Sequence, residues 1–385
     1  MSTAAAFRLG VIAALAAALA ACSDGNGGGG TAWPTSGWAV EAPDEHGMDA
    51  AVLEGAREYA FRPEKHTQGV VVVRHGVIVA EWYETGRDET SFATSWSVAK
   101  SFTSAAIGIA IEEGLIEGVD VRLAEFFPDW RGTDKEAITL RDVLQMATGL
   151  DWVESYDPGD LSSSDIIQMI LGESDQLAYV ASRPLAVPPG TFFSYSSGDT
   201  MLLSGVLEAV TGRNAGEYAA EKLLRPIGMA PVDWWRDAEG QTVTYCCVDT
   251  PSREFARFGL LYLRGGEWDG ARIVSADWVA ASLSPSPSYA GYGYQWWLSE
   301  GTDDLPEYFS ARGHDGQFIY VIPSLDLVVV RNGHYDKYPG EPMANPSLWP
   351  LIPSDGLIEG AGTVAPEGGW DDSEFLAPIV ASIVD

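Results

Sequence analysis

QGVVVVRHGVIVAEWYE, residues 68–84, is the strongest structural signal in the sequence. Four consecutive valines, Val70 to Val73, lead to a turn at Arg74-His75-Gly76, after which Val77 to Tyr83 return. Branched apolar residues on both sides of a glycine-containing turn predict a β-hairpin. Because no polar residue interrupts the valines, we expect this strand to be covered on both of its faces.

A helix follows the hairpin. SVAKSFTSAAIGIAIEE, residues 97–113, has apolar side chains at helical spacing, and Gly114 ends the pattern. Beyond it, the signals stay mostly helical from Val119 to about Ser288. Amphipathic stretches in this block lie at residues 140–146, 165–171, 201–210 and 254–263. We therefore expect a mostly helical lobe over about 119–288.

Strand patterns return only towards the C-terminal end. They lie at residues 292–298, 317–322 and 327–331, with a turn at 323–326, and a closing amphipathic helix is expected at 373–384. Residues 335–370, rich in Pro and Gly, predict a long irregular loop of the kind that borders binding clefts. The expected fold class is α/β (α+β): an antiparallel sheet built from N- and C-terminal strands, flanked by helices and interrupted by the helical lobe.

The composition limits the classes of partner. The 385 residues are 46% hydrophobic, which suits a globular protein with a sizeable core. There are 55 acidic and 23 basic residues, giving a formal net charge of −32. Such a surface repels phosphate backbones, so a nucleic-acid partner is not expected.

The N-terminal segment predicts export. Residues 1–21 read as a signal peptide that ends in Leu19-Ala20-Ala21-Cys22, a sequence similar to the lipobox of bacterial lipoproteins. In that interpretation Cys22 is lipidated, and residues 22–32 form a flexible tether to a folded domain at 33–385. The protein would then be anchored to the bacterial cell envelope, facing the periplasm or the outside. An ordinary cleaved signal peptide is the alternative.

The other cysteines and the histidines carry little signal. Cys246 and Cys247 are adjacent, so they exclude a disulfide framework; they could close a vicinal ring, but two small buried side chains are the favoured interpretation. The histidines, at positions 46, 66, 75, 314 and 334, have no metal-ligand spacing. No glycine-rich phosphate loop is present either, and no cofactor is predicted.

The first chemical motif is Ser97-Val98-Ala99-Lys100 at the start of the predicted helix. A spacing of three places the hydroxyl and the amine on one helix face, where a neutral amine could take the hydroxyl proton. The chain has five lysines, and only Lys100 has a serine three residues before it. Burial and the partial positive charge of a helix start would lower the pKa of Lys100. An exposed lysine on a solvated helix face is the alternative.

Two further elements could complete the site. Tyr195, in Phe193-Ser194-Tyr195-Ser196-Ser197, sits in a loop before a helix, where its phenol could relay a proton, although such a residue often only packs. The backbone amide of Gln317, after His314-Asp315-Gly316, could help to bind an oxyanion. A Ser-His-Asp triad is disfavoured because sequence neighbours on a strand point to opposite faces.

In this order, the three elements resemble the serine β-lactamase and penicillin-binding-protein superfamily, in its class C type branch. The similarity runs from about Gln68 to Arg331 and is closer to the esterases and aminohexanoate-dimer hydrolases of that branch. Supporting stretches are LRDVLQMATG (140–149), ARFGLL (256–261) and GYQWW (293–297).

The resemblance implies roles for individual residues. Ser97 would be the acylated nucleophile, Lys100 its base and Tyr195 the proton relay. The amides of Ser97 and Gln317 would form the oxyanion hole, and Tyr156 would line the cleft.

Two departures from the lactamase pattern matter. Ser197 stands where the lactamases have Asn, and His314-Asp315-Gly316 stand where they have Lys-Thr-Gly. Both changes argue against β-lactam binding. The sequence thus predicts a serine hydrolase that acts on a small ester, amide or peptide-like substrate. A catalytically silent penicillin-binding or cell-wall ligand sensor of the same fold is the alternative.

Overall fold

The computed structural model describes residues 33–156, 162–336, 362–363 and 365–384. The predicted signal peptide, Cys22, the tether and most of the 335–370 loop lie outside these ranges. Within the described residues, no helix is both long enough and apolar enough to cross a membrane.

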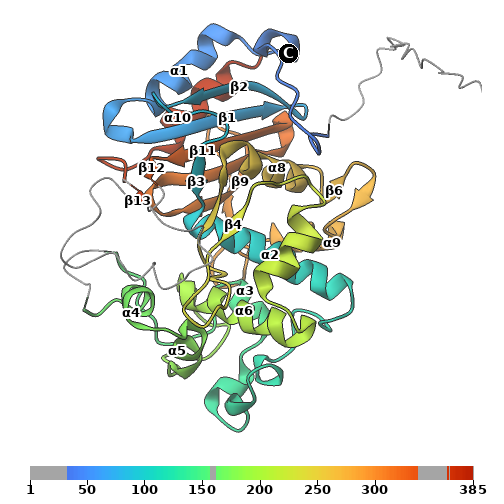
Figure 1. Cartoon of the computed structure of the whole chain (residues 1–385), viewed down its shortest axis with the longest axis vertical. Coiled ribbons are helices and arrows are strands. Elements are labelled where there is room, and N and C mark those ends of the chain that lie inside the picture. Colours follow the sequence, from blue (N-terminus) through green and yellow to red (C-terminus); the bar gives the residue numbers. More distant parts are fainter. Residues whose placement is uncertain (1–32, 157–161, 337–361, 364, 385) are drawn as a thin grey trace, which may run out of the picture. The chain divides into compact units, whose positions relative to one another are not determined.

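A six-stranded antiparallel sheet forms the upper layer of Figure 1, with the strand order β2-β1-β11-β10-β9-β8. Its strands are β1 (Thr67–Arg74), β2 (Val77–Tyr83), β8 (Trp297–Ser299), β9 (Tyr308–Gly313), β10 (Gln317–Ile322) and β11 (Leu327–Gly333). The N-terminal hairpin joins the C-terminal strands through β1 and β11, which pair from Val70 with Arg331 to Val73 with Val328. The predicted hairpin and fold class are confirmed.

Helices cover both faces of this sheet. α1 (Ala50–Ala60) and α10 (Asp372–Ala381) pack on one face with Val70 and Val72. α2 (Ala99–Glu112) and α8 (Ser252–Leu263) lie on the other, in the core that includes Val71 and Val73. Since successive strand residues point to opposite faces, both sets of valines are buried, as the uninterrupted run predicts.

The region expected to form one helical lobe, about 119–288, contributes one helix to the sheet layer and the other helices to the layer below. α8 lies inside it in sequence but packs directly on β10 and β11, and a side chain at Gly259 would meet Val328 and Ile319. The region also contains short strands that the sequence analysis missed because two to four residues are too few to show an alternating pattern. One group is β4 (Asp233–Trp234) and β5 (Val248–Pro251), which form a three-stranded sheet with β3 (Phe92–Thr94) in the order β3-β5-β4. The other is the hairpin of β6 (Glu267–Trp268) and β7 (Ala271–Arg272).

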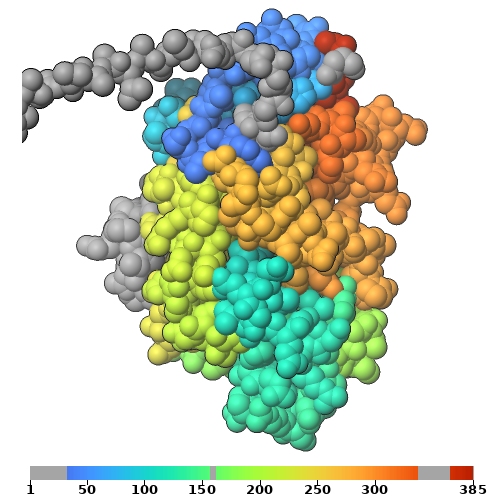
Figure 2. Space-filling model, turned by 90° about the vertical axis from the view of Figure 1, so that its right-hand side faces the viewer, coloured from blue at the N-terminus to red at the C-terminus, as the bar shows by residue number. Residues whose placement is uncertain are grey.

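The remaining helices build the layer below the sheet. They are α3 (Leu140–Leu144), α4 (Asp165–Gly172), α5 (Gln176–Ser182), α6 (Ser197–Thr211), α7 (Ala215–Ala219) and α9 (Ala276–Ser282). Figure 2 shows the teal segment that includes residues 123–137 at the end of the domain opposite the sheet, next to the yellow-green α6 and α7. Phe127 from that segment packs against Gly205 of α6.

Two strand predictions near the C-terminal end need correction. Residues 292–298 were expected to be a strand, but only β8, from Trp297, is one, because Gln295 has a positive φ of 63° that breaks an extended backbone. β9 was not predicted, since its Phe309-Ser310-Ala311-Arg312 sequence has no β-branched residue. Residues 335–336, at the start of the expected loop, pair as β12 with residues 362–363 within it as β13.

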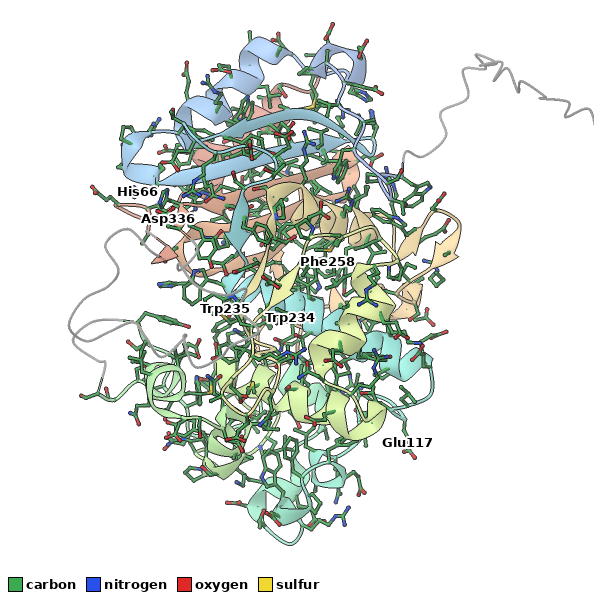
Figure 3. The ribbon with its side chains drawn as sticks, viewed as in Figure 1. His66, Glu117, Trp234, Trp235, Phe258 and Asp336 are labelled. Carbon is green, nitrogen blue, oxygen red and sulfur yellow. A yellow bond between two sulfur atoms is a disulfide. The ribbon has the colours of Figure 1, made fainter. Side chains whose placement is uncertain are left out.

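The core below the sheet is aromatic. Phe258 of α8 lies between the sheet and the helices (Figure 3), with its ring centroid 3.8 Å from that of Phe102 in α2. Trp296 stacks on Phe258 at 5.7 Å. This packing holds α2, the helix of the Ser97–Lys100 motif, against the sheet layer.

Asp372 ties α10 to the sheet, and we expect its loss to destabilise the protein. Its carboxylate accepts hydrogen bonds from Arg312 Nη2 (2.5 Å), Tyr320 Oη (2.5 Å) and Tyr308 Oη (3.1 Å). Replacing Asp372 by Ala should lower the free energy of unfolding in urea by about 1–3 kcal/mol, because three donors lose their acceptor. Asp371→Ala, which removes only the N-cap of α10, should cost about 1 kcal/mol. A loss below that of Asp371→Ala would contradict the role of this cluster.

Candidate active site

Ser97 lies on a 3₁₀ turn, Trp96–Val98, that leads directly into α2. The turn is held from behind, because Ser95 Oγ accepts hydrogen bonds from the backbone amides of Cys247 (3.2 Å) and Val248 (2.7 Å). Trp96 has a positive φ of 43°, which bends the chain between β3 and the helix. The serine is therefore placed at the helix start, half-buried at the edge of the core.

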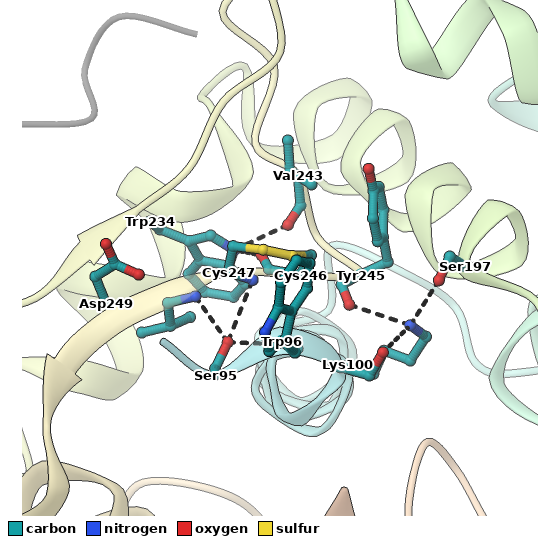
Figure 4. Close-up of a disulfide and its surroundings, with 12 residues drawn as sticks. Ser95, Trp96, Lys100, Ser197, Trp234, Val243, Tyr245, Cys246, Cys247 and Asp249 are labelled. Carbon is teal, nitrogen blue, oxygen red and sulfur yellow. Dashed lines mark hydrogen bonds between the residues drawn. A yellow bond between two sulfur atoms is a disulfide. The ribbon is translucent and has the colours of Figure 1, made fainter. Parts of the chain in front are cut away.

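Lys100 reaches back from the first turn of α2 to Ser97. Its Nζ lies 2.9 Å from Ser97 Oγ, 3.0 Å from Ser197 Oγ and 3.1 Å from the backbone oxygen of Tyr245 (Figure 4). The side chain is 1% exposed, so the alternative of a solvated lysine on a helix face is wrong. α2 is buried along nearly its whole length, which explains why its lysine is buried with it.

The electrostatic surroundings of Lys100 suit a base. Burial lowers the pKa of its amine to about 8, against the smaller opposing effects of the Glu154 and Asp199 carboxylates. Glu154 and Asp199 were not identified from the sequence. Asp199, in the first turn of α6, is itself buried, and burial raises its pKa to about 7 although Thr148 donates a hydrogen bond to it (2.8 Å).

Tyr195 completes the group around Ser97. The Lys100 Nζ lies 5.0 Å from the centroid of the phenol ring. Burial, with a smaller contribution from Glu154, raises the pKa of Tyr195 above its usual value. The Ser97 side chain is close enough to the phenol to have a small lowering effect on its pKa. The phenol therefore stays protonated near neutral pH, which suits a proton donor rather than a phenolate base.

Ser197 and Glu154 extend the group into α6. Ser197 is the first residue of α6 and is fully buried, and its Oγ donates a hydrogen bond of 2.6 Å to Glu154 Oε1. Trp152, Glu154 and Tyr156 alternate along the chain, and the Trp152 indole (2.7 Å) and the Tyr156 hydroxyl (3.0 Å) both donate to Glu154. That period-two pattern next to Tyr156 is the sequence signal that could have revealed Glu154.

His314 lies beside these residues. Its ring stacks on that of Tyr156, with centroids 4.5 Å apart, and meets the edge of Trp96 at 5.8 Å. His314 and Asp315 were expected to lie on a strand and to point to opposite faces, which is wrong. They lie on a 3₁₀ turn in which Asp315 has a φ of 56°. As a result, Nε2 of His314 is 3.2 Å from Oδ1 of Asp315. The Ser97 hydroxyl nevertheless lies 2.9 Å from Lys100 Nζ, so the structure supports the lysine as its partner.

The turn that carries Gly316 and Gln317 packs against the Ser97 turn. A side chain at Gly313, just before it, would lie 2.3 Å from the backbone oxygen of Ser95, so only glycine allows this approach. Gln317 begins β10, and its side-chain Oε1 accepts hydrogen bonds from Asn332 Nδ2 (3.2 Å) and the Gly333 amide (3.1 Å). These contacts keep the Gln317 side chain buried in the sheet.

Cys246 and Cys247 form a disulfide, whereas two separate thiols were the favoured interpretation. Cys247 has a positive φ of 80°, so the two side chains do not alternate as they would on a strand. The pair directly follows Tyr245, whose carbonyl accepts from Lys100 (Figure 4). Among the residues that the structure describes, no group of three or more His, Cys, Asp or Glu side chains is arranged to hold a metal ion.

The chain belongs to the Beta-lactamase family, whose model matches residues 46–345. The match spans the sheet, the Ser97–Lys100 pair, Tyr195 and the 314–317 turn. This confirms the predicted relationship to the serine β-lactamase and penicillin-binding-protein superfamily. The protein is thus a member of a hydrolase family with the β-lactamase fold.

The chain is similar to two hydrolases of known name and to one solved structure. The chain is 27% identical, over 295 residues, to the 6-aminohexanoate-dimer hydrolase of Paenarthrobacter ureafaciens, covering 70% of this chain and 72% of that protein. It is 24% identical, over 307 residues, to the esterase/β-lactamase LipL of Mycobacterium tuberculosis, covering 72% and 66%. A solved Bacillus anthracis structure, provisionally assigned as a 6-aminohexanoate-dimer hydrolase, superposes with a TM-score of 0.64 at 23% identity, over 78% of this chain and 81% of that one.

Proposed function

We propose that this protein is a serine hydrolase that cleaves an ester or amide bond through an acyl-enzyme on Ser97. The observation that carries the proposal is the buried amine of Lys100, 2.9 Å from Ser97 Oγ, with a pKa lowered to about 8 by that burial. A lysine buried without a carboxylate in direct contact costs stability, and such groups gather at catalytic sites.

The proposed reaction has two halves. Lys100 takes the proton of Ser97 Oγ as that oxygen attacks the carbonyl carbon, and the amides of Ser97 and Gln317 stabilise the oxyanion. The leaving group departs with a proton supplied through Tyr195, and an acyl-serine ester remains. Water then attacks this ester by the same route in reverse, releasing the acid and restoring the Ser97 hydroxyl.

The proposed substrates are esters and linear amides rather than β-lactams. One relative is named as a hydrolase of the 6-aminohexanoate dimer, and another as an esterase/β-lactamase. In this chain Ser197 replaces the asparagine of the lactamase pattern, and its hydroxyl is engaged by Lys100 and Glu154. His314 takes the place of the lactamase lysine and stacks on Tyr156. Neither residue reproduces the charge or the amide that the lactamase pattern supplies.

Covalent labelling tests this function. We expect a fluorophosphonate probe to add one label, mapped by mass spectrometry to Ser97, and a panel of p-nitrophenyl esters and linear amides to be turned over. Ser97→Ala should lose both, whereas Ser101→Ala, a neighbouring serine that donates to the Gln295 backbone oxygen, should keep both. Turnover by Ser97→Ala at the parent rate would overturn the proposal. Labelling without turnover of any substrate would favour the silent sensor.

The pH dependence of kcat/KM should report Lys100. The amine must be neutral to accept a proton, so kcat/KM should fall about tenfold per pH unit below a pKa near 8 and reach a plateau above it. Because the pKa of Tyr195 is raised, no decline should begin below about pH 10. An essential histidine would instead place the acidic decline near pH 6.5, and that outcome would contradict the assignment of the base.

We also propose that the chain is held at the cell envelope by a lipid on Cys22. The support is the apolar leader, the Leu19-Ala20-Ala21-Cys22 sequence and the glycine-rich stretch that follows. Expression in a bacterial host with an alkyne-tagged fatty acid should label the protein and place it in the membrane fraction, and Cys22→Ser should abolish both. A labelled Cys22→Ser variant, or an unlabelled parent, would refute the anchor.

A further inference from the structure

Glu154 has no role in the proposed reaction of Ser97, Lys100 and Tyr195, although it lies next to them. Its carboxylate receives four hydrogen bonds: from Trp152 Nε1 (2.7 Å), the Ser197 amide (2.8 Å), Ser197 Oγ (2.6 Å) and Tyr156 Oη (3.0 Å). All four partners are donors, and a set of donors alone suits an ionised carboxylate. The first turn of α6 adds the favourable field of a helix N-terminus.

Packing at the start of α6 positions the segment that carries Glu154. A side chain at Gly198, the second residue of α6, would lie 2.8 Å from the ring of Trp152, so glycine lets the indole pack on the helix start. Trp152 Nε1 and Tyr156 Oη both donate to Glu154, so these three side chains lie on the same side of the segment.

The hydrogen bonds of Ser197 connect this carboxylate to the lysine. A serine hydroxyl has one proton, and the 2.6 Å contact assigns it to Glu154 Oε1. Ser197 Oγ is then an acceptor towards Lys100 Nζ, which lies 3.0 Å away. The Tyr245 carbonyl, at 3.1 Å, can only accept as well.

These acceptors determine the orientation of a neutral amine. Its two N–H bonds point to Ser197 Oγ and the Tyr245 carbonyl, and its lone pair is left for the third neighbour, the Ser97 hydroxyl at 2.9 Å. We propose that Glu154 is a positioning residue of this active site: by taking the proton of Ser197, it makes Ser197 an acceptor and so aims the Lys100 lone pair at Ser97. This inference rests on the proposed function.

The charge of Glu154 should also affect the pH dependence of the reaction. The titratable groups that face Lys100 are Glu154, Asp199 of α6 and the phenols of Tyr195 and Tyr245, with Tyr156 and His314 one layer further out. The Glu154 carboxylate favours the protonated amine, so removing its charge makes the neutral amine easier to form. A residue with only a structural role would not move the pH dependence in that direction.

The experiment compares three variants with the parent by kcat, KM and the pH profile of kcat/KM. Glu154→Gln should lower the plateau kcat about 10- to 100-fold with KM changed less than about threefold, because the lone pair is misaimed, and its acidic decline should shift to lower pH. Ser197→Ala keeps the carboxylate, so it should lose the plateau rate with a smaller shift of the decline. Glu154→Asp should restore the decline to the parent pH.

Controls separate this inference from the proposed function. Asp151→Asn removes an exposed carboxylate three residues away and should leave rate and profile unchanged. Thermal unfolding checks each fold, and if Glu154→Gln does not fold, Ser197→Ala and Glu154→Asp decide the question. A parent enzyme without turnover or Ser97 labelling defeats the proposed function. An active parent whose Glu154→Gln or Ser197→Ala variant keeps the parent kcat and profile overturns only the role of Glu154.

Discussion

Replacing Lys100 by Met should lower kcat/KM for a p-nitrophenyl ester by about 1,000-fold or more while the protein stays folded. The change removes the amine that lies 2.9 Å from Ser97 Oγ and that is proposed to take its proton. Methionine has a similar length, is flexible and fills apolar space well, so the core around α2 should close over it. Ser197 and the Tyr245 carbonyl lose a donor, but no charge is left buried in its place.

The measurement is made at the plateau pH of the parent enzyme, together with thermal unfolding. Fluorophosphonate labelling of Ser97 should slow in parallel, because the same proton must leave the hydroxyl. Lys135→Met is the matched control: Lys135 donates to the backbone oxygens of Ala181 and Arg183, far in sequence from the site, and its loss should leave kcat/KM unchanged. A Lys100→Met enzyme within tenfold of the parent would show that another group activates the serine.

Arg331→Met should destabilise the protein by about 3–5 kcal/mol, the largest stability effect that we expect. Arg331 is fully buried in β11, and its guanidinium donates to Thr67 Oγ1 and to the backbone oxygens of Lys65, Asp315 (2.9 Å) and Gly316 (2.6 Å). The Trp370 ring lies 4.5 Å from its Cζ. Methionine would remove this donor from all four acceptors, in a place that water does not reach.

The effect of Arg331 should extend to activity, because two of its acceptors belong to the turn before Gln317. A side chain at Gly316 would meet Nη1 of Arg331 at 2.3 Å, which shows how closely the turn is seated. Urea unfolding measures the stability, and Arg272→Met, which breaks an exposed ion pair with Glu267, should cost less than about 0.5 kcal/mol. If Arg331→Met lost no more stability than Arg272→Met, Arg331 would not be the support of this turn.

The elements that could be predicted from the amino-acid sequence are those whose signals are local. The valine run and the turn at Gly76 predict β1 and β2, because β-branched residues on both sides of a glycine-containing turn favour a hairpin. The spacing of Ser97 and Lys100 is equally local: three residues along a helix bring two side chains together whatever surrounds them. The order of motifs along the chain was sufficient to predict the family, which the family match confirms.

The other contacts of Ser97 and Lys100 depend on the tertiary structure. Ser197 and Tyr245 reach Lys100 across 97 and 145 positions of sequence, and Glu154 joins them through Ser197 from a third segment. No periodicity records such contacts, because they depend on how α2, α6 and the loop at Tyr245 pack around a common core. The same limit applies to β9. Tyr308 and Phe309 favour a strand, but the residues from Ser310 to Gly313 do not, and they are extended because they pair with β10. The burial that lowers the pKa of Lys100 is likewise a property of the packed domain, since the first turn of α2 would be exposed to water on its own.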